Sequence, residues 1–95
     1  MYIAVGYKIT KAGMVRIVIW RDDTYAIAEV HACGRVINHE VWIIQRHASY
    51  EIGGKRIEAG EYAPATSQWE RLGFTVPTEW DAMAKVKALR EGVGK

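Results

Sequence analysis

Three histidines, His31, His39 and His47, recur at intervals of eight residues, and Glu29 and Cys33 lie close to the first of them. Imidazole, carboxylate and thiolate groups are the ligands that zinc takes in proteins, so the pattern raises the question of a metal site. The spacing argues against one. Two of these histidines on a single extended strand would lie about 26 Å apart, at roughly 3.3 Å per residue, whereas zinc ligands lie within about 2.0–2.3 Å of one ion. We therefore expect no metal and no cofactor.

The turn that follows Glu29 and His31 decides which histidine faces which carboxylate. A two-residue turn at 34–35 places His31 and His39 on opposite faces of a sheet. A three-residue turn at 33–35 would instead place Glu29 opposite His39 and near His31, and it would put two polar residues of the next strand into the core. We favour the two-residue turn, because glycine fits the first central position of a type II′ turn.

A lone cysteine, Cys33, stands beside Gly34 in this turn, with His31 two residues away. One cysteine excludes an internal disulfide framework and a zinc site built on paired thiolates. Nucleophilic catalysis needs a base within hydrogen-bond reach of the thiol and a third group that orients the base. The sequence offers no such trio, so a small, partly buried side chain is the simpler interpretation.

Glu29 and Glu40 are the best candidates for paired carboxylates, which could serve acid–base chemistry if their pKa values were pushed apart. In the favoured register they are neighbours across two strands. Lys8 and Arg16 continue the same row, and such a row is typical of a solvated charge ladder. No catalytic set remains, so we expect the protein not to be an enzyme.

The elements that must position these residues are mainly strands, because the first half of the chain alternates apolar and polar residues and is rich in Val, Ile and aromatics. Turn signals at 11–13, 22–23 and 34–35 divide it. The three-residue turn at 11–13 pairs Tyr7 with Ile17. The predicted strands are Tyr2–Ile9, Met14–Trp20, Thr24–Ala32 and Val36–Arg46.

Shorter elements are predicted in the second half. Residues 49–52 and 55–59 flank Gly53-Gly54 and predict a short hairpin that extends the sheet or folds across one face. Residues 67–70 match a capping box and predict one or two helical turns, and Thr78 is the expected N-cap of a helix over 79–91. The fold class is therefore α+β: an antiparallel meander of four to six strands, a C-terminal helix packed on one face, and a short helical turn before it. We expect one domain over residues 1–95, strand-rich over 1–60 and helix-containing over 65–92.

The predicted registers sort the side chains onto two faces. One face is expected to be the core beneath the helix: Ile3, Val5, Tyr7, Ile9, Val15, Ile17, Ile19, Ala26, Ala28, Val30, Ile37, Val41 and Ile43. The opposite face has an apolar middle that must be covered either by the chain's own later segments or by another chain. We expect its aromatic, aliphatic and arginine residues to bind a partner, since Trp, Tyr and Arg dominate interface hot spots: Val18, Trp20, Tyr25, Ile27, Trp42, Ile44, Arg16 and Arg46.

The net charge and the hydropathy of the chain bear on whether its partner is a nucleic acid or a membrane. A net charge of +2 is too small to favour nucleic acid, although aromatic rings beside arginines on a sheet keep single-stranded nucleic acid as an alternative. No apolar run is long enough to cross a bilayer and the N-terminus lacks a signal-peptide layout. We therefore expect a cytoplasmic location with no membrane partner.

Binding rather than catalysis is the expected function, with another protein or a second copy of the chain as partner. The domain would act by occupying a partner's surface; a homodimeric structural protein is a further alternative. In its general make-up of one sheet, one or two helices and many aromatics, the chain resembles short accessory proteins of phages and mobile elements, including anti-CRISPR inhibitors of host defence. That likeness is one of general type and carries no motif.

Overall fold

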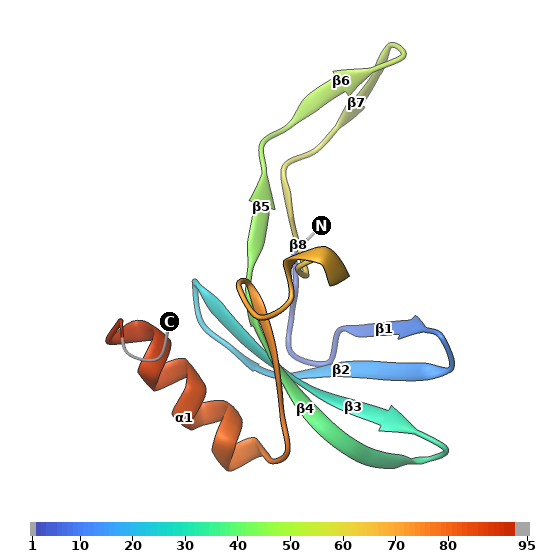
Figure 1. Cartoon of the computed structure of the whole chain (residues 1–95). Helices are drawn as coiled ribbons and strands as arrows, with labels where there is room; N and C mark the ends of the chain where they lie inside the picture. The colour runs from blue at the N-terminus through green and yellow to red at the C-terminus, as the bar shows by residue number, and fades with distance from the viewer. Residues whose placement is uncertain (1, 93–95) are drawn as a thin grey trace.

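A five-stranded antiparallel sheet forms the body of the protein (Figure 1), and the computed structural model describes residues 2–92. Its spatial order is β1-β2-β3-β4-β9. One helix, α1 (Glu79–Arg90), packs against one face, and a single 3-10 turn, η1 (Thr66–Gln68), precedes β9. The predicted α+β fold is thus confirmed. The strands are β1 Lys8–Lys11, β2 Met14–Arg21, β3 Tyr25–Ala32, β4 Arg35–Ile43 and β9 Gly73–Val76.

The turn between β1 and β2 is one residue shorter than predicted. Lys11 pairs with Met14, so the turn consists of Ala12 and Gly13, which have φ of 54° and 77°. Positive φ at both central residues matches a type I′ turn, whose twist suits a hairpin. Lys8, rather than Tyr7, therefore lies opposite Ile17.

The turn between β2 and β3 is longer than the predicted pair of aspartates. The carboxylate of Asp22 accepts hydrogen bonds from the backbone N–H groups of Thr24 and Tyr25 at 2.8 and 2.7 Å. This Asx-type arrangement pairs Arg21 with Ala26, and a bulge at Ile19 then changes the register again.

The turn between β3 and β4 is formed by Cys33 and Gly34, not by residues 34–35. Both have positive φ, at 52° and 77°. A bulge in β4 then shifts the pairing by one residue, so that Glu29 lies opposite His39. The resulting register is the one that a three-residue turn would have given, and the polar residue Glu40 is indeed buried.

These one-residue shifts move whole sets of side chains to the other face. The predicted core face was wrong in part: Ala26 and Ala28, expected beneath the helix, lie on the opposite face. We call the side covered by α1 the helix face; its buried residues are Ile27, Val41, Phe74, Ala82 and Val86. We call the other side the ribbon face, after the two-stranded ribbon that residues 45–62 form. Its buried residues are Ile3, Val18, Ala26, Ala28, Trp42 and Ile44.

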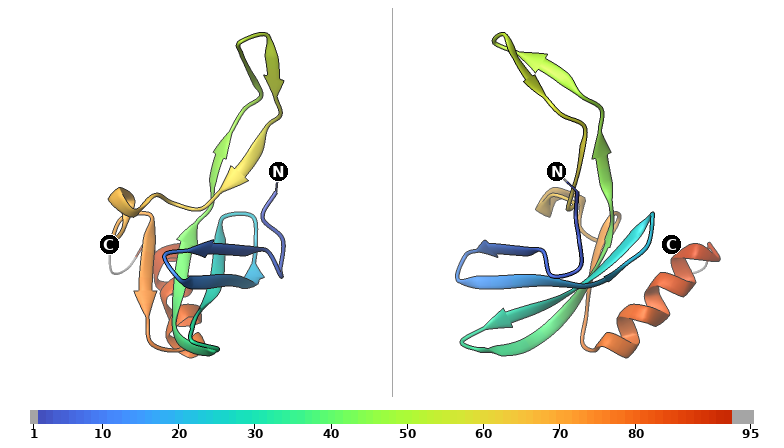
Figure 2. Two further views of the ribbon diagram at one scale, coloured as in Figure 1. Left: turned by 90° about the vertical axis from the view of Figure 1, so that its right-hand side faces the viewer. Right: turned by 180° about the vertical axis from the view of Figure 1, so that it is seen from behind.

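The chain between β4 and η1 leaves the body as a two-stranded ribbon, residues 45–62 (Figures 1 and 2). Its lower part pairs β5 (Gln45–His47) with β8 (Gly60–Tyr62), and its tip pairs β6 (Tyr50–Ile52) with β7 (Lys55–Ile57). The predicted hairpin around Gly53-Gly54 is confirmed. Its expected position on or beside the sheet is wrong, because the ribbon points away from the sheet in both views.

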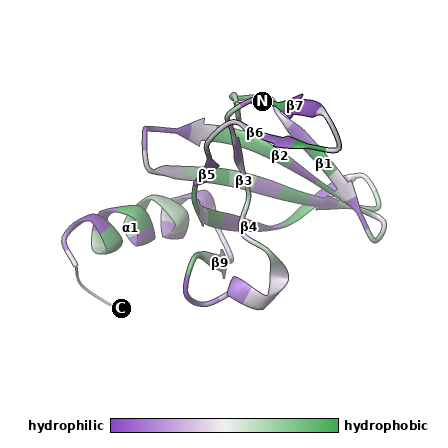
Figure 3. Cartoon of the chain, turned by 90° about the horizontal axis from the view of Figure 1, so that it is seen from above, coloured by the Kyte–Doolittle hydropathy of each residue, from purple (hydrophilic) through white to green (hydrophobic). Residues whose placement is uncertain are grey.

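The helix α1 begins as predicted, with the Thr78 hydroxyl accepting from the backbone N–H of Asp81 at 3.1 Å. It ends at Arg90. Hydrophobic and hydrophilic stretches alternate along it (Figure 3), and Ala82 and Val86 are its buried residues. Within residues 2–92, no helix has both the length and the apolar character that a membrane span requires.

Candidate functional site

The apolar residues expected to share one partner-binding face are divided between two faces. Val18, Trp42 and Ile44 lie on the ribbon face and are at most 5% exposed. Ile27 is fully buried on the helix face, with Trp20 and Tyr25 packed against the same cluster. The expectation of one shared outer face is therefore wrong, and the cause is the shifted register of both hairpins.

The ribbon face is covered by the chain itself. Ala63 and Trp69 pack against its buried cluster, and so do Tyr7 and Ile9 from the N-terminal segment. Trp69 lies so close to the backbone of Gly73 that a Cβ added there would be 2.4 Å from the indole ring. The ring of Trp42 is thus interior, because later segments of the same chain close over it.

Arg16 and Glu40 form an ion pair on the ribbon face rather than a solvated ladder. The Nε of Arg16 donates to both carboxylate oxygens of Glu40 at 3.0 Å, and the indole Nε1 of Trp42 donates to Oε1 at 2.9 Å. Glu40 is buried. The small side chain of Ala28, directly opposite Glu40 on β3, lies on the same face and leaves space for the long arginine to reach across. The expected row with Lys8 and Glu29 is wrong, since both residues are on the other face.

A pocket of about 450 Å³ opens beside this ion pair. Its walls are mainly apolar, and the indole of Trp69, which donates to Thr75 Oγ1 at 2.9 Å, forms one side. Two of its polar lining residues, Arg16 and Glu40, already bond to each other, and with mainly apolar walls the pocket suits an apolar group. The lining residues include Ile9, Met14, Trp42, Ala63, Pro64 and Trp69.

The ribbon carries large apolar side chains that the described body of the protein leaves exposed. Tyr50, Ile52 and Tyr62 are 50%, 64% and 46% exposed. An isolated two-stranded hairpin is marginally stable in water, and its outer edges present unpaired backbone groups. In the described chain, β6 and β7 pair only with each other. Within residues 2–92, the tip of the ribbon therefore combines exposed apolar side chains with strand edges that pair with no other strand.

A buried carboxylate, Glu61, fixes the base of the ribbon to the body. Its Oε1 accepts from Arg21 Nη1 at 2.5 Å and from the backbone N–H of Ile3 at 2.9 Å, while Oε2 accepts from Arg21 Nη2 at 3.2 Å. The hydrogen bonds from Arg21 lower the pKa of Glu61, and the same bonds raise the pKa of Arg21. We call these three residues, with Arg46, the ribbon anchor.

Arg46, expected to contact a partner, belongs to this anchor. Its Nη2 lies 3.1 Å from Glu61 Oε2 and also donates to the backbone carbonyl of Asp23. The anchor was not predicted from the sequence, because Glu61 is forty positions from Arg21 and no local pattern joins them.

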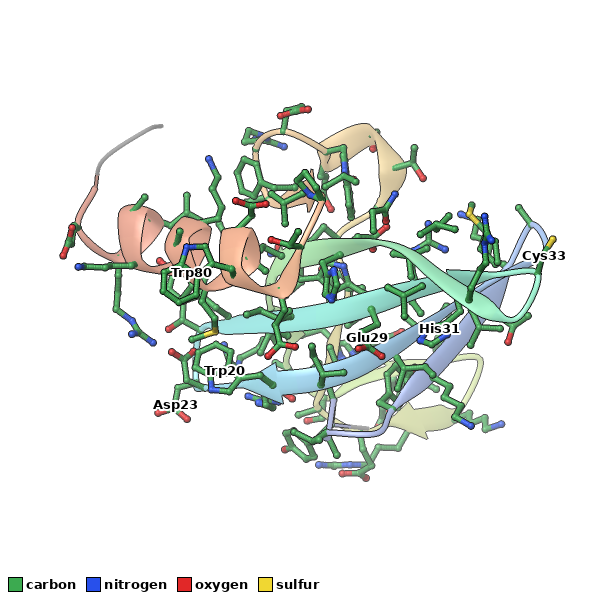
Figure 4. All side chains as sticks on the ribbon, turned by 90° about the horizontal axis from the view of Figure 1, so that it is seen from below. Trp20, Asp23, Glu29, His31, Cys33 and Trp80 are labelled. Atoms are coloured by element: carbon green, nitrogen blue, oxygen red, sulfur yellow. The ribbon has the colours of Figure 1, made fainter. Side chains whose placement is uncertain are left out.

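A second polar cluster lies on the helix face, where Glu29 is paired with His39 across β3 and β4. The Nε2 of His31 is 3.1 Å from Glu29 Oε1. Glu79, the first residue of α1, brings a third carboxyl or imidazole ligand group to within 4.8 Å of those of Glu29 and His39. In Figure 4, Glu29 and His31 lie between the start of α1 and the turn that carries the exposed Cys33.

The pairing of Glu29 with His39 is the one expected from a three-residue turn at 33–35, the less favoured of the two alternatives in the sequence, and the bulge in β4 produces it. Glu79 could not be assigned to this cluster from the sequence, because a glutamate at a helix N-terminus carries no signal of which strand residues it will contact. Searches of protein-family models, of curated proteins and of solved structures found no match to the chain.

Proposed function

We propose that the protein is a small protein-binding domain that acts by occupying a partner's surface, and that the ribbon of residues 45–62 makes the contact. The observation that carries the proposal is the exposure of Tyr50, Ile52 and Tyr62 on an element that no segment within residues 2–92 covers. Aromatic and aliphatic side chains of this kind form the centres of protein interfaces. Surface occupation without chemistry is how an inhibitor or an adaptor works.

A different protein is favoured over a second copy by the charges of the tip. The central residue of β6 is Glu51 and that of β7 is Arg56. Two-fold pairing of like edges centred on either strand would place Glu51 against Glu51 or Arg56 against Arg56, and like charges directly opposite each other are destabilising. A partner that adds its own strand to one edge avoids this conflict.

Nucleic acid is less well supported. The single-strand interpretation needed Trp20, Tyr25 and Trp42 on one sheet face, and these rings are on opposite faces. On the ribbon itself, Arg56 is paired with Glu58 at 3.0 Å. A balanced ribbon of this kind offers little of the counterion release that drives binding to phosphates.

Site-specific photocrosslinking tests the proposal. Benzoylphenylalanine in place of Tyr50 is expected to give a discrete crosslinked product in the native cells, because the ribbon tip would lie in the interface. The matched control places the same probe at Val36, which is 44% exposed on β4 of the body. Ile52→Ser, combined with the probe at position 50, should remove the product while leaving the far-UV circular dichroism unchanged.

Three results would contradict the proposal. Equal crosslinking from positions 50 and 36 would mean that the ribbon has no special role. A product at twice the chain mass of 10.7 kDa would identify a homodimer instead. A product that disappears on nuclease treatment would favour the nucleic-acid alternative.

A further inference from the structure

Three side chains from three different elements converge on the helix face beside the N-terminus of α1. Glu29 comes from β3, His39 from β4 and Glu79 from the first turn of the helix. One imidazole nitrogen and one oxygen of each carboxylate all lie within 4.8 Å of one another. This set is separate from the ribbon and from the pocket on the ribbon face.

His39, the histidine of this set, has a buried ring nitrogen that makes no hydrogen bond within the described chain. His39 is only 8% exposed, and its Nδ1 is buried without a hydrogen-bond partner in the described chain. A buried polar atom with no partner is costly and calls for an explanation. The unpaired nitrogen belongs to the same imidazole ring that lies within reach of both carboxylates, so this ring has bonding capacity that the described chain does not use.

We propose that Glu29, His39 and Glu79 bind a divalent cation of the zinc class. Imidazole and carboxylate ligands suit zinc, whereas calcium and magnesium prefer all-oxygen sites. Tetrahedral ligands about 2.0–2.2 Å from one ion lie roughly 3.4 Å from each other. The observed spread of up to 4.8 Å must therefore shorten by up to about 1.4 Å for the three groups to bind one ion. Glu79 is exposed, so its side chain can supply this movement.

His31 completes the surroundings as a positioning residue. Its Nε2 is 3.1 Å from Glu29 Oε1, so it orients the carboxylate that faces the ion. Outer contacts of this kind typically alter metal affinity about 10–100-fold when they are removed. Three protein ligands leave a fourth position for water.

The ion would join the sheet to the start of α1. The buried contacts of the helix come from Ala82 and Val86, one and two turns beyond Glu79. The first turn is otherwise held by its own cap at Thr78. A cation bridging β3, β4 and Glu79 would thus fasten the end of the helix that apolar packing leaves free.

Zinc titration of the chelator-treated full-length chain, followed by calorimetry, tests the proposal. We expect one ion per chain, and a melting temperature that rises to a plateau as zinc saturates the site. Glu79→Gln should weaken zinc binding at least about tenfold, and His31→Ala should weaken it about 10–100-fold. Glu70→Gln, an equal charge change at another exposed position, should leave zinc affinity unchanged.

Cobalt provides a readout that does not depend on the stability of the variants. Co²⁺ bound by the wild-type chain should show visible absorption bands typical of four-coordinate nitrogen and oxygen ligands, and Glu79→Gln should lose them. Absence of stoichiometric zinc binding would overturn the proposal. So would zinc binding that survives both Glu79→Gln and His39→Gln, or that is lost in His47→Ala, because His47 lies on the ribbon.

Discussion

The guanidinium of Arg21 at the end of β2 donates to both carboxylate oxygens of Glu61 in β8, at 2.5 and 3.2 Å. This pair joins the last residue of a sheet strand to the base of the ribbon. Arg21 also donates to the backbone carbonyl of Ile3 at 2.6 Å, so the N-terminal segment is held at the same point. A single buried carboxylate thus ties the base of the ribbon to both β2 and the N-terminal segment.

Glu61→Gln should destabilise the fold by about 2–3 kcal/mol, because the charged hydrogen bonds of Arg21 lose their anionic acceptor. Urea denaturation measures the change. Glu58→Gln is the matched control: Glu58 also pairs with an arginine on the ribbon, but both side chains are largely exposed, so the expected change is within about 0.5 kcal/mol. Equal effects of the two variants would show that the anchor adds nothing beyond a surface ion pair.

Low pH should weaken the ribbon anchor, because protonated Glu61 no longer forms an ion pair with Arg21. The hydrogen bonds from Arg21 hold the pKa of Glu61 below its ordinary value in the folded protein. A depressed folded pKa contributes stability that is present above the unfolded pKa, about 4.3 for glutamate, and that is lost as pH falls through the folded pKa. The free energy of unfolding of the wild type should therefore fall below this pH more steeply than that of Glu61→Gln. Parallel pH profiles for the two proteins would refute this assignment.

The elements were predictable from local patterns, whereas their registers were not. Gly53-Gly54 and Thr78 act within a few residues, and the hairpin and helix they predict are present. The faces depend instead on the bulges at Val18/Trp20 and Val30/His31, which accumulate single-residue shifts that no local signal reports. The pairing of Glu29 with His39 follows from one of these shifts, and the approach of Glu79 to both follows from how α1 packs on the sheet, which no local pattern reports.

The β1–β2 turn offers a gain in stability. Ala12 has a φ of 54°, a region that alanine resists and asparagine tolerates, and Gly13 follows it. Ala12→Asn creates the Asn-Gly pair favoured in type I′ turns and should stabilise the fold by about 0.5–1 kcal/mol. Thermal denaturation measures it. The same substitution at Ala84, exposed within α1, should be destabilising because asparagine is a poorer helix former. A loss of stability in Ala12→Asn would contradict the turn geometry.

Substitution of Trp42 and of Trp80 compares how much a buried and an exposed tryptophan contribute to stability. Trp42 is 1% exposed beneath Trp69, whereas Trp80 on α1 is 83% exposed. Trp42→Ala should cost about 3–5 kcal/mol, because it opens a large cavity and leaves Glu40 without the indole donor. A loss of that size is a large share of the roughly 5–15 kcal/mol by which such domains are stable. Trp80→Ala should change the free energy of unfolding by less than about 0.5 kcal/mol. If instead Trp42→Ala left urea denaturation and near-UV circular dichroism unchanged, the ring would have to lie at the surface, and the division of the sheet into a ribbon face and a helix face would be wrong.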